Sequence, residues 1–255
     1  HFKMELIKEF RAGLKAREFT VYYQHKVSPS THAVKGVEAL VRWQKTDGTL
    51  VSPADFIPMA EETGLIIDLG RYVLEESCRA VRVLQKAGAD LTMAVNLSPL
   101  EFKQPDIVSH IEFALDQYGI SPASLEVEIT ETTMMTDLEQ TVEKLTILKD
   151  KGVSVAIDDF GTGYSSLYYL KKLPISTLKI DRSFINDIAD DPGDAQIVET
   201  IVLMARNLGI SVVAEGVETQ TQLDLLNAYD CELVQGYFYA KPMPLEALLD
   251  YLSTG

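Results

Sequence analysis

The sequence predicts an α/β barrel of eight strands whose first strand runs antiparallel to the second. Three observations support this fold class: the chain length, an alternation of two hydrophobic periods, and a short polar turn near the start. The chain has 255 residues, a normal length for one α/β barrel. Apolar residues make up 46% of it, so a large core can be buried in a single domain, residues 1–255.

Short runs rich in β-branched residues alternate along the chain with longer stretches of helical period. The expected strands are Phe19–Val27, Val34–Val41, Leu91–Asn96, Leu125–Ile129, Val153–Ile157, Thr177–Ile180, Ser211–Ala214 and Leu233–Tyr237. The clearest helical patterns are Leu69–Ala87, Ile107–Tyr118, Leu138–Lys151, Ala195–Leu208 and Gln220–Tyr229. This alternation predicts a TIM-like (β/α)8 barrel, with an open, doubly wound sheet as the alternative.

The start of the chain departs from the regular alternation. Leu6, Phe10 and Leu14 fall at helical spacing, so residues 1–18 are expected to open the domain as a helix. A helix at the first residue indicates a piece cut from a longer polypeptide. The first two strands are separated only by the polar turn Ser28–Lys35. Because a parallel pair needs a longer crossover, these strands should form an antiparallel hairpin.

Composition excludes several classes of protein. No apolar run approaches the length of a membrane span, and no secretory signal opens the chain. The net charge of −15 argues against a general nucleic-acid-binding surface, which needs clustered Lys and Arg. Cys78 and Cys231 are expected to be reduced and packed, as in a cytoplasmic protein. The excess of acidic residues either forms a solvated surface or includes carboxylates that converge on metal ions. The positions of these carboxylates in the fold distinguish the two interpretations.

Polar residues stand at or near the ends of the later predicted strands. In a barrel these ends converge on one mouth, where active sites lie. The expected ring contains Glu38, Asn96, Glu128, Asp158, Asp159, Lys179, Asp181, Glu215 and Gln235. Taken singly, each has an ordinary structural explanation as a strand residue, a turn former or a helix cap. Their shared position favours a site, and divalent cations would relieve the repulsion among the carboxylates.

The type of ligand limits the metal. Oxygen donors without histidine suit Mg²⁺ or Mn²⁺, with Ca²⁺ expected as an inhibitory competitor. The four histidines are scattered and show no zinc-binding spacing. The adjacent carboxylates of Asp158 and Asp159 suggest a pair of metals, with Asp158 bridging them. Two metals that lie close together suit in-line displacement at phosphorus.

Motifs in a fixed order run along nearly the whole chain, beginning with Glu38-Ala39-Leu40. The matching segments are Glu38–Trp43, Phe56–Pro58, Val95–Ser98, Glu128–Glu131, Asp158–Ser166, Leu178–Asp181, Ala214–Glu218 and Gln235–Tyr237. Together they resemble the EAL family of cyclic di-GMP phosphodiesterases, which is named after the first of them. One three-letter motif would be weak evidence, whereas an ordered series of this length leaves little room for coincidence.

The resemblance implies hydrolysis of cyclic di-GMP to linear pGpG, which ends a bacterial second-messenger signal. It assigns one metal to Glu38, Asn96, Glu128 and Asp158. It assigns the second metal to Asp158, Asp159 and Glu215. The implied catalytic residues are Glu38, Lys179, Glu215 and Asp159. Lys179 would position the attacking water and offset developing negative charge. Another reading of the family makes Glu215 a general base, which two metals render unnecessary.

The resemblance also implies contacts with the substrate and with partners. The expected substrate-binding residues are Gln24, Leu40, Arg42, Asp181 and Gln235, with Arg42 reaching a phosphate. Glu131 and Glu218 are expected to support loops. Glu131 would anchor Asp159–Ser166, which shapes the second metal site and the family's dimer contact. The expected partners are a second copy of the chain and an upstream sensory or GGDEF domain in the full-length protein, without nucleic acid or membrane contact from this domain.

One departure from the family pattern is His25, which stands where proline is common. It occupies none of the positions assigned to a metal. The main alternative function is a catalytically silent receptor for cyclic di-GMP, because many EAL-like domains have lost catalysis. Such domains usually lack a metal ligand or the loop motif, and this chain keeps all of them. A third reading is an unrelated Mg²⁺-dependent phosphohydrolase on a barrel.

Overall fold

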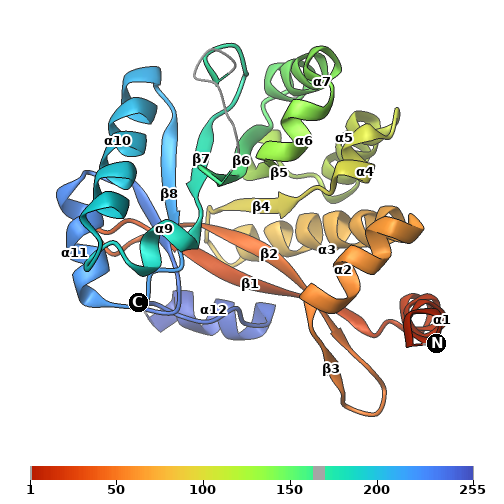
Figure 1. Ribbon diagram of the computed structural model, residues 1–255. Coiled ribbons are helices and arrows are strands. Elements are labelled where there is room, and N and C mark those ends of the chain that lie inside the picture. The colour runs from red at the N-terminus through yellow and green to blue at the C-terminus, as the bar shows by residue number, and fades with distance from the viewer. Residues whose placement is uncertain (1, 163–169, 255) are drawn as a thin grey trace.

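The computed structural model describes residues 2–162 and 170–254 and shows a closed barrel of strands surrounded by helices (Figure 1). The strands are β1 (Phe19–Val27), β2 (Val34–Gln44), β3 (Leu50–Val51), β4 (Thr92–Asn96), β5 (Leu125–Thr130), β6 (Ser154–Phe160), β7 (Thr177–Ile180), β8 (Ser211–Glu215) and β9 (Leu233–Gln235). The order is β1-β9-β8-β7-β6-β5-β4-β2-β3, and an additional β1–β2 pairing closes the ring. The predicted barrel is confirmed, and the open sheet is excluded.

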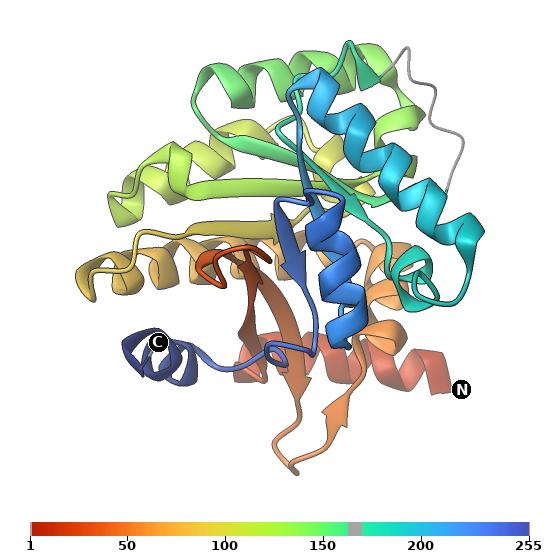
Figure 2. The same ribbon diagram turned by 90° about the vertical axis from the view of Figure 1, so that its left-hand side faces the viewer.

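The larger helices lie outside the strands and cover the barrel (Figure 2). They are α1 (Phe2–Ala16), α2 (Pro53–Thr63), α3 (Ile66–Lys86), α5 (Ile107–Tyr118), α7 (Leu138–Asp150), α10 (Pro192–Leu208), α11 (Gln220–Ala228) and α12 (Leu245–Thr254). The shorter ones are α4 (Pro99–Lys103), η1 (Pro122–Ser124), α6 (Glu131–Thr136) and α9 (Arg182–Asn186). Within the described residues, no helix is both long and apolar enough to cross a bilayer.

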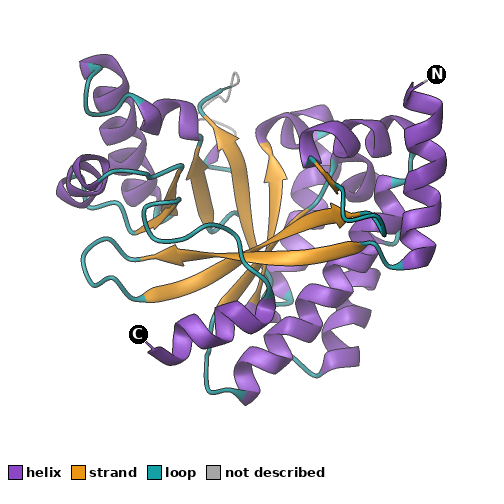
Figure 3. Ribbon diagram, turned by 90° about the horizontal axis from the view of Figure 1, so that it is seen from below, coloured by secondary structure: helices purple, strands orange, loops and turns teal. Residues whose placement is uncertain are grey.

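The irregular start of the barrel is an antiparallel hairpin, as the short turn predicts. Strand β1 pairs with β2 from Phe19↔Trp43 onward and is also antiparallel to β9 through Val27↔Val234. From β2 through β4 to β9 the neighbouring strands are parallel. Seen from below, the hairpin crosses the barrel, with α12 beside it (Figure 3). This register places Gln24 opposite Glu38, near the middle of both strands.

Several strand ends differ from the predicted bounds, and those of β2 and β9 have identifiable reasons. Strand β2 continues to Gln44 because both β1 and the short strand β3 pair with its last residues. Strand β9 ends at Gln235 instead of Tyr237, since Gly236 packs directly on the backbone of Val217. A Cβ at Gly236 would lie 2.1 Å from the Val217 carbonyl oxygen. The Val217 amide donates to the Gln235 carbonyl oxygen, and the Phe238 amide donates to that of Val217.

An aromatic cluster made of Phe10, Phe19, Trp43 and Phe56 joins α1, β1, β2 and α2. The rings of Phe19 and Trp43 stack with centroids 5.1 Å apart, and Phe10 meets Phe19 edge-on at 4.8 Å. The Trp43 indole donates a 3.0 Å hydrogen bond to Glu18 Oε2, so its polar atom is paired. These buried rings fasten the first helix to the base of the hairpin.

Candidate active site

The parallel strands bring seven predicted site residues to one mouth of the barrel. They are Glu38 on β2, Asn96 on β4, Glu128 on β5, Asp158 on β6, Lys179 on β7, Glu215 on β8 and Gln235 on β9. The strand register sets Asn96 beside Glu128 and Glu215 beside Gln235. The alternation of side chains along each strand then turns these groups to the barrel interior.

Lys179 is fully buried at the centre of this group. Its Nζ lies 2.5 Å from Glu128 Oε2, 2.8 Å from Glu215 Oε1, 3.2 Å from Asp158 Oδ1 and 3.4 Å from Glu38 Oε2. Burial alone lowers the pKa of Lys179, but the carboxylates raise it well above its usual range. One ammonium therefore faces four carboxylates, which leaves an excess of negative charge at the mouth.

Glu38 is held by amide side chains from two other strands, β4 and β9. The Asn96 amide donates to its Oε1 at 2.7 Å, and the Gln235 amide donates to its Oε2 at 2.7 Å. Gln235 Nε2 also contacts Gln24 Oε1 at 3.0 Å, and Gln24 donates to the Ala240 carbonyl at 3.1 Å. Burial and the charge of Glu128 raise the pKa of Glu38. Gln235 Oε1 is buried without a hydrogen-bond partner, so an acceptor remains available beside the carboxylates.

Asp158, Asp159 and Glu215 form a compact cluster of oxygen donors. One carboxylate oxygen from each lies within 4.8 Å of the others. Asp159 reaches this position with a left-handed backbone, φ 55°, and its amide donates to Asp158 Oδ1 at 3.0 Å. Burial raises the pKa of Glu215 to about 8, and burial also raises the pKa of Asp158 and Asp159. Carboxylates so crowded fit a divalent cation, which suits oxygen ligands.

A second ion-pair group lies in the barrel interior, and the sequence reasoning did not include it. Lys26 Nζ is 2.8 Å from Glu126 Oε1 and 2.7 Å from Glu128 Oε1, and these side chains are almost fully buried. Thr177 Oγ1 donates to Glu126 Oε2 at 2.6 Å. The signal was present in the strand period, because Lys26 follows Gln24 by two residues and Glu126 precedes Glu128 by two.

A cavity of about 750 Å³ opens at the mouth, within the range of small-molecule sites. Gln24, Leu40, Gln235 and Glu218 line it, as do several residues outside the predicted set. The residues of the lining that were missed are Arg182, Asn186, Gly216, Thr219, Gln222, Gly236 and Tyr237. They lie in or beside the short helix α9 and in the segments that follow β8 and β9. Such positions carry no signal in hydrophobic periodicity.

Arg42 lies in the wall of an adjacent cavity of about 320 Å³, which shares Leu40 and Asn96 with the first. Its guanidinium lies 5.6 Å from the centroid of the Tyr22 ring, and it donates to the Val41 carbonyl at 2.9 Å. Arg42, the predicted phosphate-binding residue, thus lies beside the carboxylate cluster rather than inside it.

The remaining predicted residues lie around the mouth. Asp181 caps α9 by accepting from the Ser183 amide at 3.0 Å, and after burial its charge is the next cause that raises the pKa of Asp159. Glu131 is buried, and its Oε2 accepts from the Gly161 amide at 3.4 Å, at the start of the predicted loop. Residues 163–166 of that loop lie outside the described residues. Glu218 is exposed, and its amide donates to Gln222 Oε1 at 2.8 Å.

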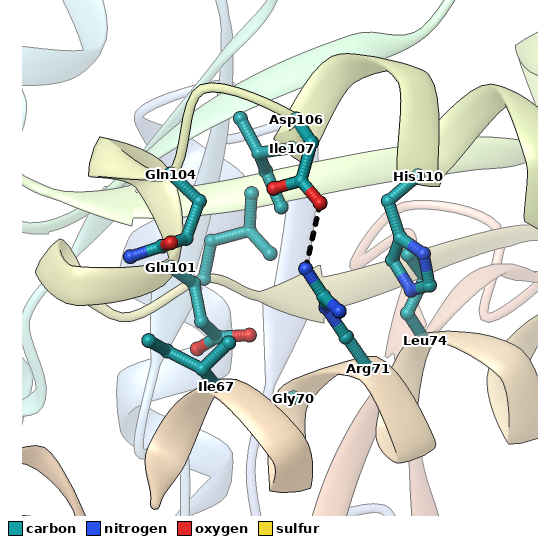
Figure 4. Close-up of a pocket in the computed structure, with 10 residues that line it drawn as sticks. Ile67, Gly70, Arg71, Leu74, Glu101, Gln104, Asp106, Ile107 and His110 are labelled. Atoms are coloured by element: carbon teal, nitrogen blue, oxygen red, sulfur yellow. Dashed lines mark hydrogen bonds and ion pairs between the residues drawn. The ribbon is translucent and has the colours of Figure 1, made fainter. Parts of the chain in front are cut away.

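A separate small pocket lies between α3, α4 and α5, where Arg71 pairs with Asp106 (Figure 4). Glu101 is buried there and accepts from the Ser98 amide at 2.9 Å. A Cβ at Gly70 would lie 1.5 Å from Glu101 Oε1, so glycine lets this carboxylate rest on α3. Burial raises the pKa of Glu101 to about 7. The space of about 10 Å³ holds at most about one water, which identifies packing and not a substrate site.

Comparison of the chain with known proteins identifies its family. The EAL domain model matches residues 7–242, so the chain belongs to the EAL domain family. It is 44% identical over 248 residues to the bifunctional diguanylate cyclase/cyclic di-GMP phosphodiesterase MucR of Pseudomonas aeruginosa, covering 97% of this chain and 36% of MucR. It is 42% identical over 251 residues to the cyclic di-GMP phosphodiesterase NbdA of the same organism, covering 98% of this chain and 32% of NbdA.

Solved structures agree with this assignment. The structure described as PaMucR phosphodiesterase in complex with c-di-GMP superposes with a TM-score of 0.93 at 44% identity, covering 96% of this chain and 99% of that chain. The chain spans about a third of the length of the curated relatives MucR and NbdA. The resemblance inferred from the ordered motifs is confirmed.

Proposed function

We propose that this domain hydrolyses cyclic di-GMP to linear pGpG with two Mg²⁺ or Mn²⁺ ions. The observation that carries the proposal is the cluster of Asp158, Asp159 and Glu215, whose oxygens lie within 4.8 Å of one another. These residues are the ones that the ordered motifs assign to the second metal. The cluster adjoins a cavity of about 750 Å³ in a chain that is 44% identical to a protein whose structure is described as a c-di-GMP complex.

The first cation is assigned to Glu38, Asn96, Glu128 and Asp158. The donor set fits, because the Asn96 amide already donates to Glu38 Oε1 and its own oxygen remains as a ligand. The cations supply charge stabilisation at phosphorus and lower the pKa of a bound water. The hydrogen bonds from Asn96 and Gln235 hold the Glu38 carboxylate in one orientation before substrate arrives.

The other side chains at the mouth act on the substrate. Lys179 places a fixed positive charge where negative charge develops on the phosphoryl oxygens, and it helps to position the attacking water. Gln24, Leu40, Asp181 and Gln235 contact the dinucleotide. Arg42 binds a phosphate from the adjacent cavity, where its guanidinium is half-buried. Ca²⁺ would compete for the same oxygen donors and is expected to inhibit.

The test is product analysis of cyclic di-GMP incubated with the purified domain in Mg²⁺, Mn²⁺, Ca²⁺ or EDTA. We expect pGpG with Mg²⁺ or Mn²⁺ and none with Ca²⁺ or EDTA. Glu38→Ala serves as the matched control and is expected to give no product, since it removes a ligand of the first metal. Tight binding of cyclic di-GMP by the parent without any product would refute hydrolysis and leave a receptor.

For the full-length protein we propose an upstream sensory or GGDEF domain and a homodimer. The support for the upstream domain is that the chain spans only about a third of MucR and NbdA, and about a third of the oxygen sensor protein DosP of Escherichia coli, to which it is 34% identical. The homodimer is what the family resemblance implies. The mass of the purified domain in sedimentation equilibrium tests the dimer directly. A monomer at micromolar concentration would remove that part of the proposal.

A further inference from the structure

Lys26 is a buried cation that the proposed reaction does not use. It lies on β1, two residues beyond Gln24, and only 3% of the residue is exposed. Burying an ammonium is unfavourable unless carboxylates surround it. Within the described part of the chain, the ion pairs of Lys26 are with Glu126 and Glu128, both on β5. Both of these ion pairs are therefore with β5, the strand that carries Glu128, a proposed ligand of the first metal.

Glu128 is shared between two lysines, one on each carboxylate oxygen. Lys26 donates to Oε1 at 2.7 Å, whereas Lys179 donates to Oε2 at 2.5 Å. The two contacts differ in character, because Lys179 also faces Glu38, Asp158 and Glu215. Lys179 therefore contacts four carboxylates, whereas Lys26 contacts only those of Glu126 and Glu128 among the described residues.

The ammonium of Lys26 is also held in place by its other partner, Glu126. Glu126 accepts from Lys26 through Oε1 at 2.8 Å and from the Thr177 hydroxyl through Oε2 at 2.6 Å. A continuous chain of hydrogen bonds thus runs from β7 through Thr177, Glu126 and Lys26 to Glu128. Glu126, Lys26 and Glu128 each have a partner on both sides, so the carboxylate of Glu128 cannot rotate without breaking the contact to Lys26.

We propose that Lys26 is a positioning residue that orients Glu128 for the first divalent cation. The inference rests on the proposed function, since it assigns Glu128 to that cation. Lys26 keeps one oxygen of Glu128 occupied and leaves the other for exchange between Lys179 and the cation. Partners of this kind, which hydrogen-bond a metal ligand without touching the metal, set the affinity of a site.

The test compares two variants by calorimetric titration with Mn²⁺ in the absence of substrate. Lys26→Met combined with Glu126→Gln removes one positive and one negative charge, so the interior keeps its net charge while Glu128 Oε1 loses its partner. We expect Mn²⁺ affinity to fall about 10- to 100-fold. Glu126→Gln alone retains the contact between Lys26 and Glu128, and we expect its affinity to stay within about threefold of the parent.

A purely structural role is separated by turnover at saturating Mn²⁺. If Lys26 acts through metal affinity, the double variant recovers most of its kcat once Mn²⁺ is saturating, and its thermal unfolding remains cooperative. A folded double variant that binds Mn²⁺ as tightly as the parent would overturn the role of Lys26 and leave the proposed function intact. A parent protein that binds no Mn²⁺ would overturn both.

Discussion

Two side-chain clusters in this barrel are built from opposite kinds of residue. The aromatic cluster of Phe10, Phe19, Trp43 and Phe56 contains one polar atom pair, from Trp43 to Glu18. The cluster at the mouth consists of carboxylates and amides, with Lys179 at its centre. The aromatic rings are closed off from water, whereas the mouth cluster borders the cavity, and strand β2 contributes to both through Trp43 and Glu38.

The difference shows which cluster holds the fold and which retains charge for a ligand. Burial of each aromatic ring stabilises the domain by roughly 1.5–3 kcal/mol. Buried ion pairs contribute little net stability, because desolvation offsets their attraction. Changes in the aromatic cluster should therefore alter stability and spare the chemistry. Changes at the mouth should alter the chemistry and make stability depend on cations.

The largest effect is expected from Lys179→Met, which fills the volume but leaves four carboxylates without their common cation. Without metal, the variant should lose about 3–5 kcal/mol of stability, since breaking a buried pair leaves charge unpaired. Saturating Mn²⁺ should restore much of that stability, whereas hydrolysis should remain about 10²- to 10³-fold lower. Urea unfolding with and without Mn²⁺, together with steady-state kinetics, measures both. Normal turnover would remove Lys179 from the mechanism.

Trp43→Ala tests the opposite cluster. Removing the indole from a fully packed site should lower the free energy of unfolding by about 3–5 kcal/mol. The folded fraction should keep its Mn²⁺ affinity and its kcat within a few-fold, because Trp43 contacts the aromatic cluster and not the mouth. Trp43→Phe is the milder control. Lost turnover with unchanged stability would show that the two clusters are not separable through β2.

The smallest effect concerns Glu101, a buried carboxylate away from the mouth. Its pKa is raised from 4.5 to about 7, first by burial, so between these values the folded state binds more protons than the unfolded state. Stability should therefore fall as pH rises through this window, by about 3 kcal/mol in total. Glu101→Gln stays neutral and should be more stable than the parent by up to that amount at pH 8.

Urea unfolding of the parent and of Glu101→Gln at pH 4.5, 6 and 8 measures this difference. The two proteins should converge at the lowest pH, where the parent carboxyl is also protonated. Glu199→Gln, on the exposed face of α10, is the matched control and should unfold like the parent at each pH. A constant difference between parent and Glu101→Gln at all three pH values would show that burial of this carboxylate does not set its charge.

Much of the fold was predictable because it depends on local pattern. The alternation of strand and helix periods gave the barrel, and the short turn Ser28–Lys35 gave the hairpin. The gathering of Glu38, Asn96, Glu128 and Asp158 followed from one topological rule about strand ends. The assignment of individual metals to these residues stays a prediction.

What escaped the sequence depends on contacts between distant segments. The inward direction of Lys26 and Glu126 is visible only once Gln24 and Glu128 are placed in the barrel. The helices α2 and α4 begin at local caps, Ser52 and Ser98, and neither shows enough residues at helical spacing to be recognised from the sequence. Arg182 lines the cavity at the mouth because α9 packs beside it, and no pattern in the sequence predicts that packing.

The close approach of Gly236 to Val217 has a mechanical consequence for the mouth. The segment after β8 and the segment after β9 are joined there by paired backbone hydrogen bonds, with no space for a side chain between them. Glu215 and Gln235, which directly precede these segments, therefore behave as one rigid piece. A methyl group added at position 236 would therefore displace the side chains of Glu215 and Gln235.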